Sequence, residues 1–202
     1  MVWSSASGEL IRKIVLYQKY HRVTECHFRT GSQRDGRAIE FDREVFECGN
    51  HACVLPFDPR RDEFVLIRQF RAGAYVAGMP PWTWEMVGGI VGQDESPEAV
   101  VRREAMEESG LTLGALMPIY TAMGSPGAMT EIRTMYLGLA DTAAAGGFFG
   151  LANEGEDIFA EVVSLADARD MLKSGKIIDL TCIAALQWLL LNCDEVRASW
   201  GA

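Results

Sequence analysis

The segment at positions 89–111, GIVGQDESPEAVVRREAMEESGL, constrains the fold more tightly than any other part of the chain. Ser96 is a favoured helix N-cap, and Pro97 suits the first helical position. Gly110 can end the helix because glycine adopts the left-handed conformation at no steric cost. The segment therefore predicts a glycine-rich loop followed by a helix that ends at Gly110.

Three carboxylates share one face of this predicted helix, because Glu104, Glu107 and Glu108 stand at positions i, i+3 and i+4. Like charges at that spacing repel one another and destabilise the helix. A divalent cation that prefers oxygen ligands, such as Mg²⁺ or Mn²⁺, turns this repulsion into a favourable interaction when it binds between them. The alternative is an ordinary solvated acidic face. The glycine-rich entry, Glu95 and the Arg103–Glu104 pair favour a metal site.

Length and composition indicate a compact chain that can bury a sizeable core, since 49% of the 202 residues are hydrophobic. The net charge of −9 argues against an extended basic surface and hence against nucleic acid as a partner. An acidic protein that handles an anionic substrate needs metal ions and a few well-placed arginines.

The five cysteines are odd in number and include no CxxC pair, which favours thiols in a reducing cytosol. Cys48, His51 and Cys53 are close enough in sequence to suggest zinc, but no fourth ligand is evident and buried core cysteines are favoured. The first residues lack the layout of a signal peptide, and the apolar stretch 183–191 is too short to span a bilayer. We therefore expect a cytoplasmic protein with no membrane partner.

The order of the remaining elements predicts the fold class. Strands are expected at 13–18, 20–30, 38–47, 52–57, 63–70, 113–123, 134–140 and 157–163, and further helices at 165–175 and 180–192. The irregular alternation favours an α/β (α+β) sandwich with a mixed sheet over a doubly wound fold. We expect a small N-terminal antiparallel β-sheet domain at 1–47, which needs a packing partner, and a larger domain at 48–202.

The segment 89–111 resembles the Nudix box, G-x5-E-x7-R-E-U-x-E-E-x-G-U, where U is a bulky apolar residue. Every polar and glycine position matches, and Ala105 at the first U is the loose fit. In that family the loop–helix–loop holds divalent metals against the diphosphate of a nucleoside diphosphate linked to another group. The resemblance implies the reaction class and leaves the substrate open.

A wider resemblance, from about Tyr17 to the C-terminus, points to the ADP-ribose pyrophosphatase branch of this family. The segments that carry it are Arg43-Glu44, 51–71, 84–89, 124–131, 150–158 and 183–192. It implies a Nudix α/β/α sandwich whose N-terminal β domain is exchanged in a homodimer, so that both subunits build each active site. The sequence departs from the pattern at His21, where an aromatic residue is expected, and at Ala128-Met129.

The resemblance also implies roles for individual residues. Metal ligands are expected at Gly88 (through its carbonyl), Glu104, Glu108 and Glu156. Glu154 is the expected general base, with Glu107 as a second catalytic candidate. Substrate contacts are expected from Tyr20, His21, Arg43, Arg71, Glu85, Ile90, Ser125, Pro126, Gly127 and Glu131.

Several of these residues have structural alternatives. Glu107 is as well explained by an i,i+4 pair with Arg103 as by metal binding. Tyr20 is nearly as well explained as a buried tyrosine of the sheet, and Glu85 as a partner of Arg71 alone. Without the resemblance, Glu154 and Glu156 read as an acidic surface loop. Trp82, Trp84 and Trp188 are expected in the core or an interface.

The expected reaction is hydrolysis of ADP-ribose to AMP and ribose 5-phosphate, in which Mg²⁺ neutralises the diphosphate and activates water while Glu154 accepts its proton. Two alternatives stay open. The same chemistry can act on another nucleoside diphosphate sugar, such as GDP-mannose. A catalytically silent sensor that binds ADP-ribose is the other, and the intact box glutamates argue against it.

Overall fold

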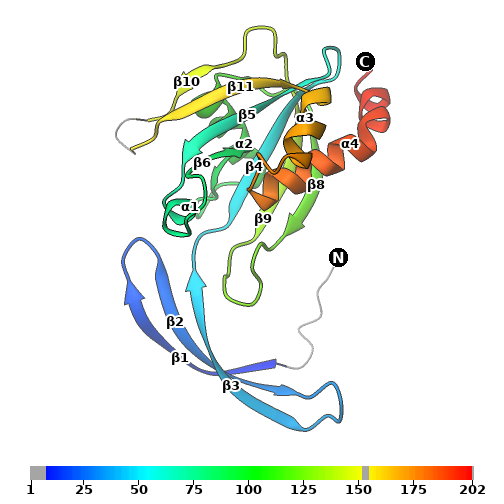
Figure 1. The fold of residues 1–202 in the computed structure, drawn as a ribbon. Coiled ribbons are helices and arrows are strands. Elements are labelled where there is room, and N and C mark those ends of the chain that lie inside the picture. The colour runs from blue at the N-terminus through cyan, green and yellow to red at the C-terminus, as the bar shows by residue number, and fades with distance from the viewer. Residues whose placement is uncertain (1–7, 152–154, 202) are drawn as a thin grey trace. The chain divides into compact units, whose positions relative to one another are not determined.

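The computed structural model describes residues 8–151 and 155–201 (Figure 1). The chain divides into two compact units. The first unit consists of Met1–Asn50 with Met123–Ile132, and the second of His51–Ala122 with Arg133–Ala202.

The first unit is built on an antiparallel sheet in the order β1-β2-β3. Its strands are β1 (Gly8–Gln18), β2 (Arg22–Gly31) and β3 (Ala38–Glu47). The turn after β2 is closed by the Ser32 N–H, which donates to the Arg37 carbonyl over 2.8 Å, and Gly36 takes a positive φ of 73° there. The loop 123–132 is attached to the end of β3, where Phe46 exchanges backbone hydrogen bonds with Ala128 and Thr130.

This sheet buries little of its own apolar surface. Leu10, Ile14, Leu16 and Tyr17 on β1 are between 41% and 53% exposed, although all are large apolar side chains. A sheet of this size has few residues with which to build a core. Its apolar side chains therefore remain available for packing against something else.

The second unit contains a mixed sheet. Along its main path the order is β10-β11-β5-β4-β9-β8, with β6 added beside β5 and β7 beside β4. β4 and β9 run parallel, whereas the other pairs are antiparallel. The strands are β4 (His51–Asp58), β5 (Glu63–Phe70), β6 (Trp82–Glu85), β7 (Val87–Ile90), β8 (Leu116–Ala122), β9 (Arg133–Leu139), β10 (Gly147–Phe149) and β11 (Ile158–Ser164).

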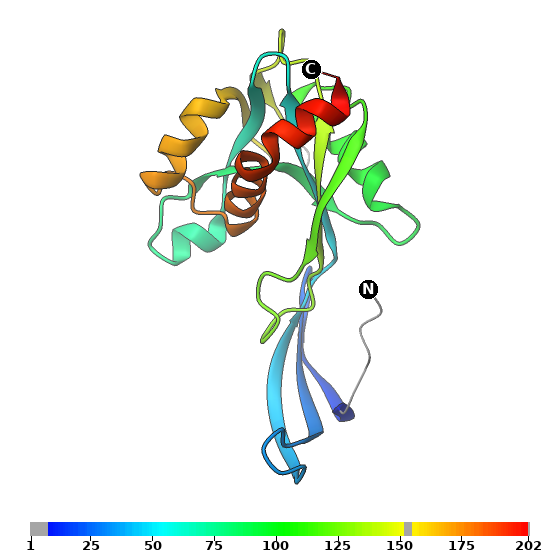
Figure 2. The ribbon, with the colours of Figure 1, turned by 90° about the vertical axis from the view of Figure 1, so that its right-hand side faces the viewer.

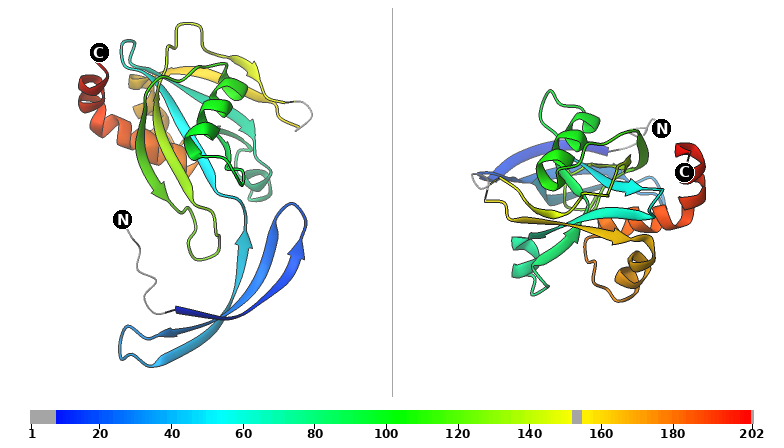
Figure 3. Two further views of the ribbon diagram at one scale, coloured as in Figure 1. Left: turned by 180° about the vertical axis from the view of Figure 1, so that it is seen from behind. Right: turned by 90° about the horizontal axis from the view of Figure 1, so that it is seen from above.

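Helices cover both faces of this sheet: α2 lies on one side, and α3 and α4 lie on the other (Figures 2 and 3). The helices are α1 (Ala72–Val76), α2 (Pro97–Ser109), α3 (Leu165–Lys173) and α4 (Leu180–Trp200). Successive residues of β4 point to opposite faces of the sheet and so pack in two different hydrophobic clusters. Val54 lies in the cluster that contains Val100 of α2, and Leu55 in the cluster that contains Leu186 of α4. The expected α/β/α sandwich with a mixed sheet is confirmed. In the described part of the chain, no helix has the length and apolar character to cross a membrane.

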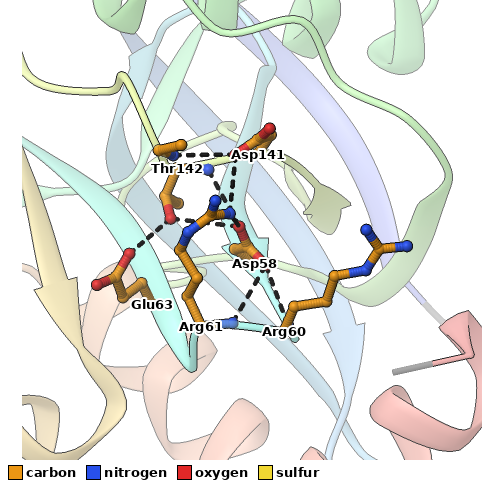
Figure 4. Close-up of polar contacts among 7 residues, drawn as sticks. Asp58, Arg60, Arg61, Glu63, Asp141 and Thr142 are labelled. Atoms are coloured by element: carbon orange, nitrogen blue, oxygen red, sulfur yellow. Dashed lines mark hydrogen bonds and ion pairs between the residues drawn. The ribbon is translucent and has the colours of Figure 1, made fainter.

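A buried carboxylate holds the β4–β5 turn to the chain after β9 (Figure 4). Asp58 is 3% exposed, and its Oδ1 accepts hydrogen bonds from the backbone N–H groups of Arg60 and Arg61. Its Oδ2 accepts from the Arg61 guanidinium over 2.6 Å and from the Thr142 N–H over 3.2 Å. Asp141 binds the same guanidinium over 2.9 Å. Residues more than eighty positions apart are thereby joined.

Some boundaries differ from the sequence-based expectations. The short elements α1, β6, β7 and β10 were not expected, because each offers too few residues to show a period. The last helix was expected to end at Asn192, and this was wrong: α4 continues to Trp200. The polar run after Asn192 still carries the buried Cys193 and Val196, which continue the helical face of Leu189.

Candidate metal and catalytic site

The box helix α2 forms as its capping residues predict. The Ser96 hydroxyl accepts a hydrogen bond from the Ala99 N–H over 3.2 Å, and Pro97 is the first helical residue. Gly110 ends the helix with a φ of 67°, in the left-handed conformation. The helix is thus placed in register by local signals at both ends.

Glu104 and Glu108 project from α2 toward β7. Glu108 is 4% exposed, and its Oε2 accepts a hydrogen bond from the Gly88 backbone N–H over 2.9 Å. Glu104 is half-buried, and a Cβ built on Gly89 would collide with its carboxylate. At Gly88 a Cβ would overlap the Ala52 carbonyl and the Cys53 side chain. The two glycines are therefore required for the close approach of strand and helix.

Arg103 binds three acidic side chains of the box segment. Its guanidinium binds Glu95 over 3.2 Å, Glu104 over 2.8 Å and Glu107 over 2.9 Å. The resemblance to the Nudix box implies that Glu95 ties the loop to Arg103, and this contact is present, as is the i,i+4 pair of Arg103 with Glu107. These carboxylates raise the pKa of Arg103 above its ordinary value, and the hydrogen bond that Arg103 donates to Glu95 is the largest cause.

The buried carboxylates carry an electrostatic cost. Burial, together with the charges of Glu104 and Glu156, raises the pKa of Glu108 to about 8. Burial is also the main reason why the pKa of Glu104 is raised, with Glu107 and Glu156 adding to it. Glutamates from α2 and from the segment before β11 thus act on one another at short range. A bound cation would remove this cost.

The donor set fits a divalent cation with hard oxygen preferences, because the carboxylates of Glu104, Glu108 and Glu156 lie close enough for their charges to act on one another. Among the described residues, however, no three such side chains are yet arranged closely enough to hold a metal ion. The oxygens are engaged elsewhere: Glu104 with Arg103, Glu108 with Gly88, and Glu156 with the Leu151 N–H over 3.2 Å. Metal binding would require these oxygens to exchange partners. Glu154, the expected base, lies outside the described residues.

Arg71 lies close enough to this site for its charge to act on Glu108. Its Nε and Nη2 each donate to one oxygen of Glu85 over 2.8 Å, a bidentate pair. The expected Arg71–Glu85 contact is therefore present. Sequence reasoning missed Thr83, whose hydroxyl donates to the same carboxylate. The i,i+2 spacing of Thr83 and Glu85 places both on one face of β6, but this strand of four residues was too short to be expected from the sequence. Ile90 ends β7 and is 40% exposed.

The remaining candidates belong to the first unit. Tyr20 is 81% exposed, so the alternative of a buried sheet tyrosine is wrong. His21 contacts both the Tyr20 and the Phe46 rings, with centroids 4.7 and 4.8 Å apart. The Arg43 guanidinium lies over the Phe41 ring at 4.7 Å. Ser125, Pro126 and Gly127 form a turn in which the Ser125 carbonyl accepts from Ala128 and Met129, and Glu131 is buried.

Comparison with known proteins identifies the class. The chain matches the NUDIX domain over residues 49–185, and it belongs to the Nudix family of hydrolases. Members of that family generally use a divalent metal.

The ADP-ribose pyrophosphatase of Escherichia coli K12 is 40% identical over 192 residues, which cover 95% of this chain and 92% of that protein. The ADP-ribose pyrophosphatase of Haemophilus influenzae is 32% identical, covering 98% and 93%. The GDP-mannose pyrophosphatase of Cronobacter sakazakii is also 32% identical, covering 93% and 97%. A solved structure of an ADP compounds hydrolase shares the fold, with a TM-score of 0.71 over 99% of each chain at 15% identity.

Proposed function

We propose that the protein hydrolyses the diphosphate of ADP-ribose to AMP and ribose 5-phosphate, with Mg²⁺ as its metal and Mn²⁺ able to substitute. The observation that carries the choice of substrate is the 40% identity to an ADP-ribose pyrophosphatase over 95% of the chain. GDP-mannose pyrophosphatases reach 32%. The proposed location is the reducing cytosol.

Arg71 is the proposed diphosphate contact. Glu85 holds one edge of its guanidinium through two hydrogen bonds, and Thr83 in turn holds Glu85. Among the described residues, Nη1 of Arg71 makes no hydrogen bond, so its donors are available to a phosphate oxygen. A guanidinium fixed in this way binds an anion with little further loss of side-chain entropy. Ile90 is proposed to line the same substrate site.

Glu104, Glu108 and Glu156, with the Gly88 carbonyl, are the proposed metal ligands. A divalent cation held there would neutralise the diphosphate charge and lower the pKa of water. Glu154 is proposed to accept the proton of the attacking water as general base. Glu107 is the second candidate for that role, although its pair with Arg103 supports a structural one.

The proposed active unit is a homodimer in which each first unit completes the partner's site. The exposed apolar side chains of β1 support this, since a small sheet needs a packing partner. Tyr20 and His21 are proposed to contact the purine, and Arg43 the phosphates. The turn 125–127 and Glu131 are proposed to approach the substrate across the same interface.

The deciding experiment is identification of the products formed from ADP-ribose with Mg²⁺, beside a panel of nucleoside diphosphate sugars that includes GDP-mannose. AMP with ribose 5-phosphate, at a kcat/KM at least tenfold above that for the other sugars, is the expected result. A preference for GDP-mannose would change the proposed substrate but not the proposed reaction, hydrolysis of a diphosphate. ADP-ribose binding without Mg²⁺-dependent turnover would identify a silent sensor instead.

A further inference from the structure

A row of aromatic and cationic side chains crosses four neighbouring strands of the second unit. Phe148 of β10 lies opposite Phe159 of β11, Phe159 opposite Arg68 of β5, and Arg68 opposite Trp84 of β6. Residues directly opposite each other in a sheet share one face. The four side chains therefore form a continuous strip near the β10 edge of the sheet.

Arg68 is held within this strip by aromatic rings. Its guanidinium carbon lies 5.3 Å from the Trp84 ring centroid and 5.6 Å from that of Phe159, both within range of a cation–π interaction. Lys176 lies 5.1 Å from the Trp84 centroid. Among the described residues, the Arg68 guanidinium makes no hydrogen bond or ion pair. Five N–H donors are thus presented by a side chain whose position is already supported.

The strip is open to solvent beside Arg68. Phe148 is 80% exposed and packs on Phe159 with ring centroids 5.0 Å apart. Trp82 is 47% exposed in the single chain, so of the two expected locations, core or interface, the core is excluded. Between these rings lies a pocket of about 280 Å³, lined by Arg68, Trp82, Phe148, Asp157 and Phe159. Grouped exposed aromatic side chains of this kind mark a binding surface more often than isolated ones do.

The chemistry of the lining restricts the ligand. Aromatic walls favour a flat ring, and Arg68 offers donors while Asp157 offers acceptors. The two charges balance, which argues against a free anion. A volume of 280 Å³ lies below the range of about 300–1,000 Å³ that drug-sized ligands occupy, so the pocket suits a single ring system. A whole nucleoside diphosphate sugar would be too large for it.

We propose that this pocket is a second binding site, which takes the base of a neutral purine nucleoside. Arg68 donates to the ring acceptors, Asp157 accepts from the exocyclic amine, and Phe148, Phe159 and Trp82 contact the faces of the ring. Asp157, which lines the pocket, directly follows Glu156 in the sequence. The charge of Glu156 acts on Glu104 and Glu108, so the pocket and the proposed metal site are connected through neighbouring residues. The site is independent of the proposed substrate.

The test is nucleoside binding by the full-length protein in the presence of a chelator, measured by isothermal titration with guanosine, adenosine and inosine. Arg68→Met removes the charge and the donors but keeps the apolar stem, and Phe148→Ala removes the exposed ring. Each should weaken guanosine binding at least fivefold. Inosine, which lacks the exocyclic amine, should bind more weakly than guanosine.

Arg34→Met is the matched control, because Arg34 is an exposed arginine in the turn of the other unit and should leave binding unchanged. Thermal melts establish that each variant is folded. Binding that survives both Arg68→Met and Phe148→Ala overturns the proposal. The proposal is also overturned if guanosine binding is lost in Glu108→Gln or Tyr20→Ala instead. A third contrary outcome is that Phe148→Ala changes only the sedimentation coefficient, because the strip is then a subunit contact.

Discussion

The Glu108 carboxylate of α2 accepts a hydrogen bond from the Gly88 backbone N–H in β7, with Oε2 and N 2.9 Å apart. A residue on the box helix is thereby joined to the strand that precedes the box loop. Burial at this contact disfavours the charged form of Glu108, which raises its pKa to about 8. A carboxylate whose pKa is perturbed by burial in this way is a candidate for a functional role.

Replacing Glu108 with Gln should abolish most turnover while the fold is kept, because the amide has nearly the same volume and is a poor Mg²⁺ ligand. Steady-state kinetics and a thermal melt check both statements. Glu98→Gln, at an exposed position in the first turn of α2, is the matched control and should stay near wild type. Activity of Glu108→Gln within about tenfold of wild type, roughly 1.4 kcal/mol of barrier, would count against a ligand role.

The identity of the base can be decided by comparing Glu154→Gln with Glu107→Gln. Loss of a general base usually lowers kcat by about two to four decades, and we expect this of Glu154→Gln with little change in metal affinity. Glu107→Gln should have the smaller effect on kcat, since its carboxylate is paired with Arg103. If Glu107→Gln lowers kcat more than Glu154→Gln does, the general base is Glu107 of the box helix.

Asp58 should contribute to stability and not to catalysis. Asp58→Asn leaves the volume unchanged but weakens the charge-assisted hydrogen bonds that join the β4–β5 turn to Thr142, and we expect a loss of about 2 kcal/mol in the free energy of unfolding. Asp141→Asn is the control, because Asp141 binds the same guanidinium from a position 77% exposed and should cost under about 0.5 kcal/mol. Urea denaturation measures both, and equal losses would refute the assignment.

The same carboxylate should give a recognisable pH dependence. Burial alone raises the pKa of Asp58, but the hydrogen bond from Arg61 and those from the backbone N–H groups of Thr142, Arg60 and Arg61 outweigh it, and the net pKa is lowered. A lowered pKa in the folded state means that stabilisation is complete above the ordinary value of 3.8 and is lost as the pH falls through the folded-state pKa. The stability difference between wild type and Asp58→Asn should therefore be constant near neutrality and shrink below about pH 4. A difference that stays constant into that range would show that charge is not involved.

Subunit exchange can be tested by complementation. A Glu108→Gln chain lacks a proposed metal ligand, and a Tyr20→Ala/Arg43→Ala chain lacks the proposed purine and phosphate contacts. Mixing the two inactive proteins should restore part of the activity, because one of the hybrid sites then carries no lesion. A fully active monomer in sedimentation, or no rescue despite proven heterodimers, would exclude the shared site.

Local patterns in the sequence were sufficient for the box helix. Ser96, Pro97 and Gly110 act through the backbone groups nearest to them, and the spacing of Glu104 and Glu108 determines their common face whatever surrounds the helix. The contact between Glu95 and Arg103 was likewise inferable, since the two lie within one short motif. The irregular alternation of the expected strands and helices favoured a sandwich with a mixed sheet, and the resemblance to a known family added the expectation of α/β/α layers.

Contacts between distant segments were decided by the tertiary structure. The hydrogen bond between Gly88 and Glu108 depends on β7 pairing with β4, and the joining of Asp58 to Thr142 depends on the parallel pairing of β4 with β9. The row from Phe148 to Trp84 exists because the registers of three strand pairs coincide. Strand periodicity determines which face a residue occupies but not which strand lies beside it, and a shift of one residue would move each of these side chains to the opposite face.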